Sequence, residues 1–108
     1  MVVRTFLKSP GNSITASVGM YNQFTKGYYY CFIAAYFSTK INDWVYKQSD
    51  WVYVPAQSSY YLGSVTLTVR SDEPKGWKWL AIALFRYDDA TGQYIKDDEL
   101  GGYWFKVW

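Results

Sequence analysis

The stretch Gly27–Ser38, GYYYCFIAAYFS, carries few polar groups apart from its tyrosine hydroxyls. Its aromatic and β-branched residues favour a pleated, half-buried surface and predict a β-strand. Successive side chains of a strand point to opposite faces. One face would carry Tyr28, Tyr30, Phe32, Ala34 and Tyr36, and the other Tyr29, Cys31, Ile33, Ala35 and Phe37. Both faces are apolar, which indicates that both can be covered.

A second apolar run, WKWLAIALFRY at Trp77–Tyr87, has the same character. Leu80, Ile82 and Leu84 would share one face, and Trp79, Ala81, Ala83, Phe85 and Tyr87 the other. A buried helix is the competing interpretation of both runs, because periodicity alone does not separate a short apolar strand from a buried helix. The Gly, Pro and Asp residues that flank the runs, and their many aromatics, favour strands. We expect Ile33, Leu80, Ile82 and Leu84 to be buried.

Shorter strands are expected along the rest of the chain. Residues 13–21 alternate, with Ile14, Ala16, Val18 and Met20 facing inward, which is typical of a strand with one wet face. Further strands are predicted at 2–7, 44–46, 51–54, 60–69, 93–96 and 103–108, with turns between them and a break or bulge at 97–102. Seven to nine strands without a convincing helix predict an all-β, antiparallel two-sheet sandwich, formed by residues 1–108 as a single domain.

The composition indicates a folded protein and limits its expected partners and covalent bonds. Half of the residues are hydrophobic and 22% are aromatic, which argues against disorder. The net charge of +2 provides no basic stripe for a phosphate backbone, so nucleic acid is not an expected partner. The single cysteine, Cys31, excludes an intramolecular disulfide, and its apolar neighbours indicate a small buried hydrophobic residue.

The sequence contains no histidine, which removes the usual general base and metal ligand. A catalytic thiol at Cys31 would lack its usual partner, and no glycine spacing matches a phosphate-binding loop. We therefore expect no catalytic residue, no cofactor and no enzyme activity. Carboxylates in two predicted turns are calcium candidates, but solvated turn residues are the simpler interpretation, and a glycosidase pair would need a cleft. These carboxylates are Asp88, Asp89, Asp97, Asp98 and Glu99.

The strand pattern resembles an immunoglobulin-like sandwich without a disulfide, and in particular the cell-adhesion-related (CARDB) domains of bacterial and archaeal surface proteins. The segment from Asn22 to Gly27 resembles the family's turn before its third strand, and 55–59 its polar stretch before the fifth. The acidic region with Asp88-Asp89, Gly92, Ile95 and 97–99 looks like the family's segment after the sixth strand. Gly101-Gly102 stands where the family has an Asn pair. The resemblance implies an adhesion or assembly role without catalytic residues.

An aromatic sheet face is the main functional feature that we predict. If Leu80, Ile82 and Leu84 face the core, the rings of their run face outward. The third, sixth and last strands of an immunoglobulin-like sheet are neighbours, so their outward residues would form one face. We place on it Tyr30, Phe32, Ala34, Tyr36, Trp79, Ala81, Ala83, Phe85, Tyr87, Trp104 and Trp108. Contiguous apolar patches on folded proteins usually mark an interface.

Four interpretations of this face stay open. The chain's own segment 39–54, with Trp44 and Trp51, could fold over it. A second copy or a larger assembly could dock on it, and this is the function that we predict: a non-enzymatic binding or assembly module that forms homo-oligomers. A carbohydrate-binding module with a Trp/Tyr platform is the alternative, although the face offers few polar groups beside its rings. Single-stranded nucleic acid would also need a basic groove, which the sequence does not contain.

The expected location follows from the assembly role. Residues 1–7, MVVRTFL, are too short for the apolar core of a signal peptide, and no apolar run reaches the length of a membrane span. The lack of a disulfide is compatible with a reducing compartment. We expect a virion or an extracellular surface, which would require a signal removed beforehand or another route out of the cell.

Overall fold

The computed structural model describes residues 2–8 and 13–107, and the side chains of residues 13–99 and 103–107. This part of the chain forms eight antiparallel strands and no helix. The strands are β1 (Val2–Lys8), β2 (Ser13–Tyr21), β3 (Tyr28–Ser38), β4 (Asp43–Gln48), β5 (Val52–Val54), β6 (Ser59–Thr68), β7 (Gly76–Asp88) and β8 (Gln93–Val107). The prediction of an all-β, antiparallel fold with two sheets is confirmed.

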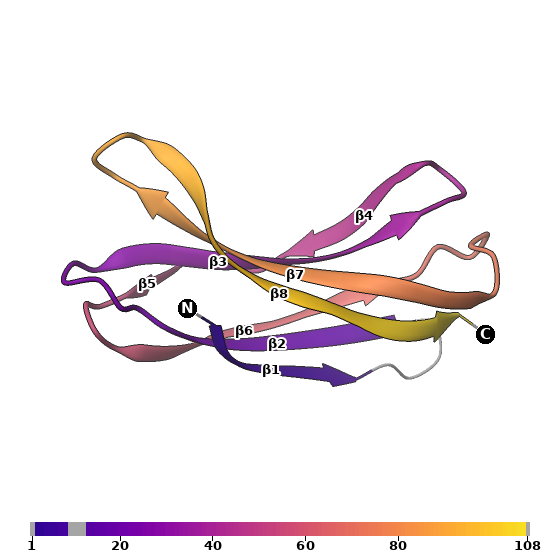
Figure 1. Cartoon of the computed structure of the whole chain (residues 1–108), viewed down its shortest axis with the longest axis horizontal. Coiled ribbons are helices and arrows are strands. Elements are labelled where there is room, and N and C mark those ends of the chain that lie inside the picture. Colours follow the sequence, from indigo (N-terminus) through magenta and orange to yellow (C-terminus); the bar gives the residue numbers. More distant parts are fainter. Residues whose placement is uncertain (1, 9–12, 108) are drawn as a thin grey trace.

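The two sheets lie face to face (Figure 1). The smaller sheet has the order β1-β2-β6 and the larger one β4-β3-β7-β8, where β4 pairs with the second half of β3 and β5 with its first residues. The outer ends of the β3–β4 and β7–β8 hairpins bend away from the three-stranded sheet, at opposite ends of the molecule (Figure 1). Among the described residues, none belongs to a helix of the length and apolarity needed to cross a membrane.

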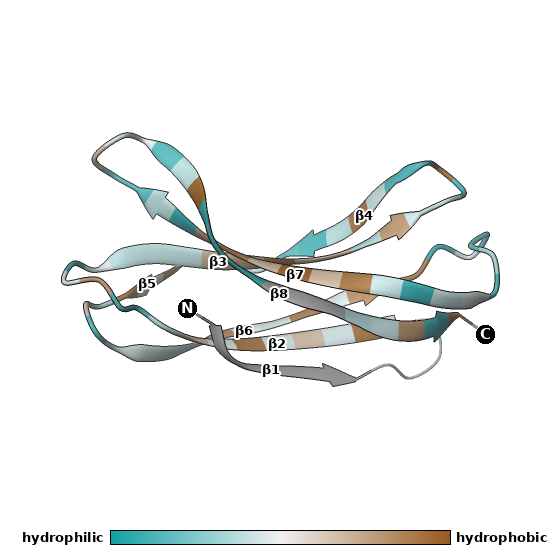
Figure 2. Ribbon diagram, viewed as in Figure 1, coloured by the Kyte–Doolittle hydropathy of each residue, from teal (hydrophilic) through white to brown (hydrophobic). Residues whose placement is uncertain are grey.

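The alternation predicted for β2 is confirmed. Its four inward residues are Ile14, Ala16, Val18 and Met20, all at most 2% exposed. On the opposite side, the hydroxyls of Thr15 and Thr66 lie 3.0 Å apart across the β2–β6 pair. Hydrophobic positions recur along β2 and β7, whereas the hairpin ends are mainly hydrophilic (Figure 2). Burial of one face of each sheet therefore holds the two sheets together.

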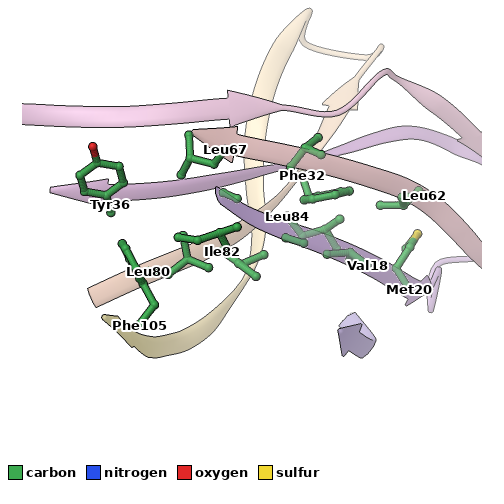
Figure 3. Close-up of a cluster of buried hydrophobic side chains, with 14 of the residues drawn as sticks. Val18, Met20, Phe32, Tyr36, Leu62, Leu67, Leu80, Ile82, Leu84 and Phe105 are labelled. Carbon is green, nitrogen blue, oxygen red and sulfur yellow. The ribbon is translucent and has the colours of Figure 1, made fainter. Parts of the chain in front are cut away.

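The register between β3 and β7 decides which face of β3 is buried. Phe32 pairs with Leu84, and Ala34 with Ile82. Paired residues share a face, and this face belongs to the hydrophobic core with residues of β2 and β6. Leu80, Ile82 and Leu84 are at most 1% exposed, as predicted. Figure 3 shows their side chains packed among core residues of both sheets.

Four residues predicted to lie on the outward face are in this core instead. They are Tyr30, Phe32, Ala34 and Tyr36, all at most 1% exposed. Their predicted placement is wrong because both faces of β3 are apolar, so alternation along β3 cannot choose between them. The register chooses, since it pairs the even-numbered residues of β3 with those of β7. Ile33, predicted to be buried, lies on the outward face and is half-buried.

Tyr30 enters the core with a polar partner for its hydroxyl. This hydroxyl donates to Asn22 Oδ1 at 3.2 Å, and Asn22 is fully buried. The amide nitrogen of Asn22 donates in turn to the backbone carbonyls of Lys26, Val54 and Pro55. One asparagine thereby ties the β2–β3 turn to the β5–β6 turn and leaves no buried hydroxyl unsatisfied there.

Tyr36 is held near the other end of β3 by Glu73, whose side chain is 0% exposed. The Glu73 carboxylate accepts hydrogen bonds from the hydroxyls of Ser38 at 2.7 Å and Tyr36 at 3.4 Å, and it pairs with Lys78 Nζ at 3.2 Å. Burial by itself raises the pKa of Glu73, but Ser38 and Lys78 outweigh burial and hold this pKa below its ordinary value. The β6–β7 connection is thereby fixed to β3.

The predicted β7–β8 hairpin is present, and β8 is longer than predicted. Gly92 has a φ of 70°, and its N–H donates to the Asp88 carbonyl at 2.7 Å, which closes the turn. The predicted break at 97–102 lies inside β8, where two register shifts against β7 occur. Such bulges re-aim side chains while pairing continues on either side.

The assignment of the two faces of β3 predicts different costs for two phenylalanines. Phe32→Ala removes a ring that is 0% exposed, whereas Phe37→Ala removes one that is 39% exposed. We expect Phe32→Ala to lower the free energy of unfolding by ~3–5 kcal/mol, and Phe37→Ala to lower it by clearly less. Urea unfolding of both variants measures the difference. Equal losses would mean that the two faces of β3 are assigned wrongly.

The buried Glu73 predicts a pH dependence of stability. Its pKa in the folded state lies below the ordinary value of 4.5, so the ionised carboxylate stabilises the fold above about pH 4.5, and this contribution is lost as the pH falls through the folded-state pKa. Glu73→Gln should be less stable than wild type at about pH 7, and the difference should narrow toward about pH 3. Denaturant unfolding across this range tests it, and a constant difference would contradict the charged state of Glu73.

Candidate binding face

The side of the five-stranded sheet that faces away from the core is rich in exposed aromatic rings. We call this side the outer face. Nine of the exposed large side chains among the described residues lie on it. They are Tyr29, Phe37, Trp44, Tyr46, Tyr53, Trp77, Trp79, Tyr94 and Trp104. So many exposed rings on one sheet face indicate a surface that binds another molecule.

One line of rings crosses four strands and is named the tryptophan row: Trp44, Phe37, Trp79 and Trp104. Trp44 pairs with Phe37 and Trp79 with Trp104, and the β3–β7 register places Phe37 beside Trp79. Both strand pairs have T-shaped rings, with centroids 5.6 Å and 5.0 Å apart. An open hollow of 410 Å³ lies between Trp104 and Trp77, which flanks the row. This end of the outer face is therefore strongly apolar.

A second line of rings, the tyrosine row, crosses the sheet nearer the β7–β8 turn and consists of Tyr53, Tyr29, Tyr87 and Tyr94. Tyr29 pairs with Tyr53 on one side and with Tyr87 on the other, and Tyr87 pairs with Tyr94. The ring centroids of Tyr29 and Tyr53 are 5.3 Å apart, and those of Tyr87 and Tyr94 5.4 Å. Four neighbouring phenol rings thus combine an apolar surface with hydroxyl groups.

Small side chains form a low floor between the two rows. Ala35 pairs with Ala81, and Ile33 with Ala83, and all four are half-buried. The two rows are eight residues apart along β3, or roughly 26 Å in an extended strand. One end of each row lies near the end of a hairpin that bends away from the core (Figure 1). Trp44 lies near the β3–β4 turn, and Tyr94 near the β7–β8 turn. The outer face thus has an aromatic ridge at either end of a shallow floor.

The floor opens into a hollow beside the tyrosine row. This hollow has a volume of 340 Å³ and is lined by Cys31, Ile33, Gln48, Trp51, Phe85 and Tyr94. The Trp51 and Tyr94 ring centroids are 5.4 Å apart, with 35° between the ring planes. The same two rings border a second hollow of 160 Å³ together with Tyr29 and Tyr87. A pair of tilted rings in contact with each other therefore borders both open spaces.

The remaining residues of the predicted face lie on the outer face with different exposure. Trp79 and Trp104 are 44% and 63% exposed. Ala81, Ala83, Phe85 and Tyr87 are half-buried. Trp108 lies outside the described residues. The structure thus brings six of the predicted residues together on one face.

The prediction missed the rings that β3 itself places on this face, Tyr29 and Phe37. The sequence contained the information, because alternation along this strand had already grouped both rings on its second face. Segment 39–54 does not cover the face as one unit, because residues 43–48 form the edge strand β4 and place Trp44 in the tryptophan row. Within that segment, Gln48 and Trp51 line the hollow over the face.

The five predicted calcium carboxylates do not converge. Among the described residues there is no group of three acidic, cysteine or histidine side chains that could hold a metal ion. The carboxylates instead bond locally: Asp88 with the Thr91 hydroxyl, Asp89 with Lys26, Asp97 with Arg86, Asp98 with the Glu99 backbone and Glu99 with Lys96. The positions of Asp88, Asp89, Asp98 and Glu99 fit solvated turns and strand-edge contacts. Asp97 differs, because its side chain is 7% exposed and pairs with the largely buried Arg86.

No protein-family model, curated protein or solved structure matches this chain. The resemblance to cell-adhesion-related domains therefore stays a prediction. The residues of the outer face are the basis on which a function can be proposed.

The setting of Cys31 predicts an unreactive thiol. Cys31 is 1% exposed, and burial raises the pKa of its thiol to about 11. At pH 8 only about one molecule in a thousand would carry the reactive thiolate. A disulfide reagent should therefore label the native protein far more slowly than a Cys31→Ala/Ser71→Cys variant, whose cysteine lies in an exposed turn. Equal labelling rates in folded proteins would contradict the burial of Cys31.

Proposed function

We propose that this protein is a non-enzymatic binding and assembly module, and that a second copy docks on its tryptophan row. The observation that carries the proposal is the row itself: four exposed rings in line across four strands, with no charged residue among them. Lys106 pairs with Trp77 at the margin. An apolar centre with a charged margin is the usual anatomy of a protein interface.

The exposed ring area is of the size that an association needs. The four rings and Trp77 are between 39% and 65% exposed. Together they amount to roughly 390–650 Å² at 150–250 Å² per ring. A standard interface buries about 800 Å² on each partner, and Tyr46 and the alanine floor adjoin the row. The row and Trp77 thus supply about half or more of the area that one partner would bury.

The ring geometry favours a second copy as the partner. The T-shaped pairs Phe37–Trp44 and Trp79–Trp104 present ring edges and ring faces side by side. A two-fold axis through the centre of the row and normal to it would bring each T-shaped pair of one copy against the other pair of the second copy, and edge-to-face contact is an arrangement that aromatic rings prefer. A partner selected by charge would require charged groups that the row does not have.

The fold-level proposal agrees with this role. We propose an immunoglobulin-like sandwich, which is supported by the order β1-β2-β6 opposite β4-β3-β7-β8. The absence of histidine from the sequence supports a role without catalysis. The resemblance to adhesion domains implies an adhesion or assembly role, and a structural place in a virion or at a cell surface is part of the same proposal.

Carbohydrate binding is a second candidate function, and the hollow beside Trp51 favours it. Polar residues border this part of the outer face, with Gln48 in the lining of the hollow and Lys96 and Glu99 on β8. The sequence alone indicated few polar groups beside the rings. Rings and polar groups together are what a sugar site requires.

If the protein associates through the tryptophan row, replacing a tryptophan of the row should weaken association, and replacing an equally exposed tyrosine elsewhere should not. Trp104 and Tyr61 are both 63% exposed, but Tyr61 lies on β6 in the other sheet. Trp104→Ser should weaken association about 30-fold or more, the effect of losing an interface ring worth ~2 kcal/mol, whereas Tyr61→Ser should leave it unchanged. Sedimentation velocity over a concentration series measures both. A wild-type protein that stays monomeric up to about 1 mM would refute the proposal.

A further inference from the structure

We infer that the hollow beside Trp51 binds a neutral sugar ring, which stacks against Trp51 and Tyr94. The inference rests on the carbohydrate-binding candidate and does not depend on association through the tryptophan row. It assigns the ligand to the tyrosine end of the outer face, where apolar rings and polar side chains meet.

The hollow has the size and the walls that a ring-shaped ligand needs. Its 340 Å³ falls within the ordinary range of ligand sites, about 300–1,000 Å³. Trp51 is half-buried, and its ring contacts that of Tyr94, which is tilted by 35° against it, so each ring helps to hold the other in place. The two rings also border the smaller hollow with Tyr29 and Tyr87. A chain of two or more sugars could therefore occupy both spaces, with the carbon-bound hydrogens of each ring against an aromatic face.

Polar groups stand on both sides of the hollow, where sugar hydroxyls would point. On the β4 side, Gln48 is exposed, and its side-chain amide has no hydrogen-bond partner among the described residues. It can offer two donors and one acceptor oxygen. On the β8 side, Lys96 pairs with Phe85 and Glu99 with Ala83, which places both on the outer face beside the floor.

The charges beside the hollow favour an uncharged ligand. Lys96 Nζ and Glu99 Oε2 are 2.7 Å apart, and their side chains are 47% and 56% exposed. This pair is neutral as a whole and still has donors and acceptors to spare. A phosphate or a nucleic-acid backbone would require an excess of positive charge. A neutral, hydroxylated ring satisfies the amide, the ion pair and the aromatic walls together.

Nuclear magnetic resonance can locate the ligand, because each of the six tryptophans gives one indole N–H signal. Neutral oligosaccharides of glucose, of mannose and of N-acetylglucosamine serve as probes, with glucose 6-phosphate as a charged comparison. We expect at least one neutral probe to shift the Trp51 indole signal progressively, with a dissociation constant in the range of about 10 μM to 10 mM. The signals of Trp77 and Trp104 should stay in place.

Matched variants test whether the sugar binds at Trp51 or elsewhere on the outer face. Trp51→Ala should weaken binding of that probe at least about tenfold, and Trp104→Ala should leave it within about twofold. Gln48→Ala, at an exposed strand position, tests the polar side and keeps the core intact, so a loss of binding there does not depend on how Trp51→Ala folds. It should weaken binding severalfold.

The outcomes are distinct for the site and for the function. Saturable binding that shifts Trp77 or Trp104 and not Trp51 would overturn the site while carbohydrate binding stands. Binding of glucose 6-phosphate in preference to every neutral probe would overturn the ligand class. Failure of all probes to bind would overturn both the inference and the carbohydrate candidate. Self-association, measured separately by sedimentation, is untouched by these results.

Discussion

Phe32 of β3 lies opposite Leu84 of β7, and the roles of both faces of the larger sheet depend on this register. Because side chains alternate along a strand, one pairing assigns every other residue of both strands to a face. The register buries Phe32, Ala34, Ile82 and Leu84 against the three-stranded sheet. It turns the alternate set outward, with the rings of the tryptophan and tyrosine rows. A shift by one residue would exchange the two sets.

The buried face of β3 contains two tyrosines, and polar side chains provide hydrogen-bond partners for their hydroxyls. A phenol ring adds much apolar area to a core, but its hydroxyl needs a partner there. Asn22 receives the hydroxyl of Tyr30, and Glu73 that of Tyr36. Both partners come from connections between strands, so each hydrogen bond also fastens a turn to β3. The core is therefore closed by polar contacts near both ends of this strand.

The outer face carries the side chains that alternate with those of the core, and many of its rings are exposed. Its two ends differ in chemistry. The tryptophan row is apolar and offers ring edges and faces for a like surface. The tyrosine row adjoins a hollow with an amide and an ion pair nearby, which suits a hydroxylated ligand. The floor of Ile33 and the three alanines separates the two ends, so the proposed association and the proposed ligand site use different parts of the outer face.

The amino-acid sequence by itself determined the all-β class, most strand positions, the β7–β8 hairpin and the burial of Leu80, Ile82 and Leu84. These features follow from local signals: alternation, turn residues and the spacing of apolar side chains. It also identified Trp79 and Trp104 as members of one face. The break that it predicted at 97–102 became a pair of bulges, because backbone pairing with β7 continues through that segment.

Only the tertiary structure decided which face of Tyr28–Ser38 is buried, and hence where Tyr30, Phe32, Ala34 and Tyr36 lie. Both faces of this stretch are apolar, so its burial free energy is similar either way, and the choice falls to the register with β7 and to hydrogen-bond partners distant in sequence. The position of Trp51 over the hollow depends in the same way on contacts across strands. Long-range pairing brings those residues together, and no local pattern encodes it.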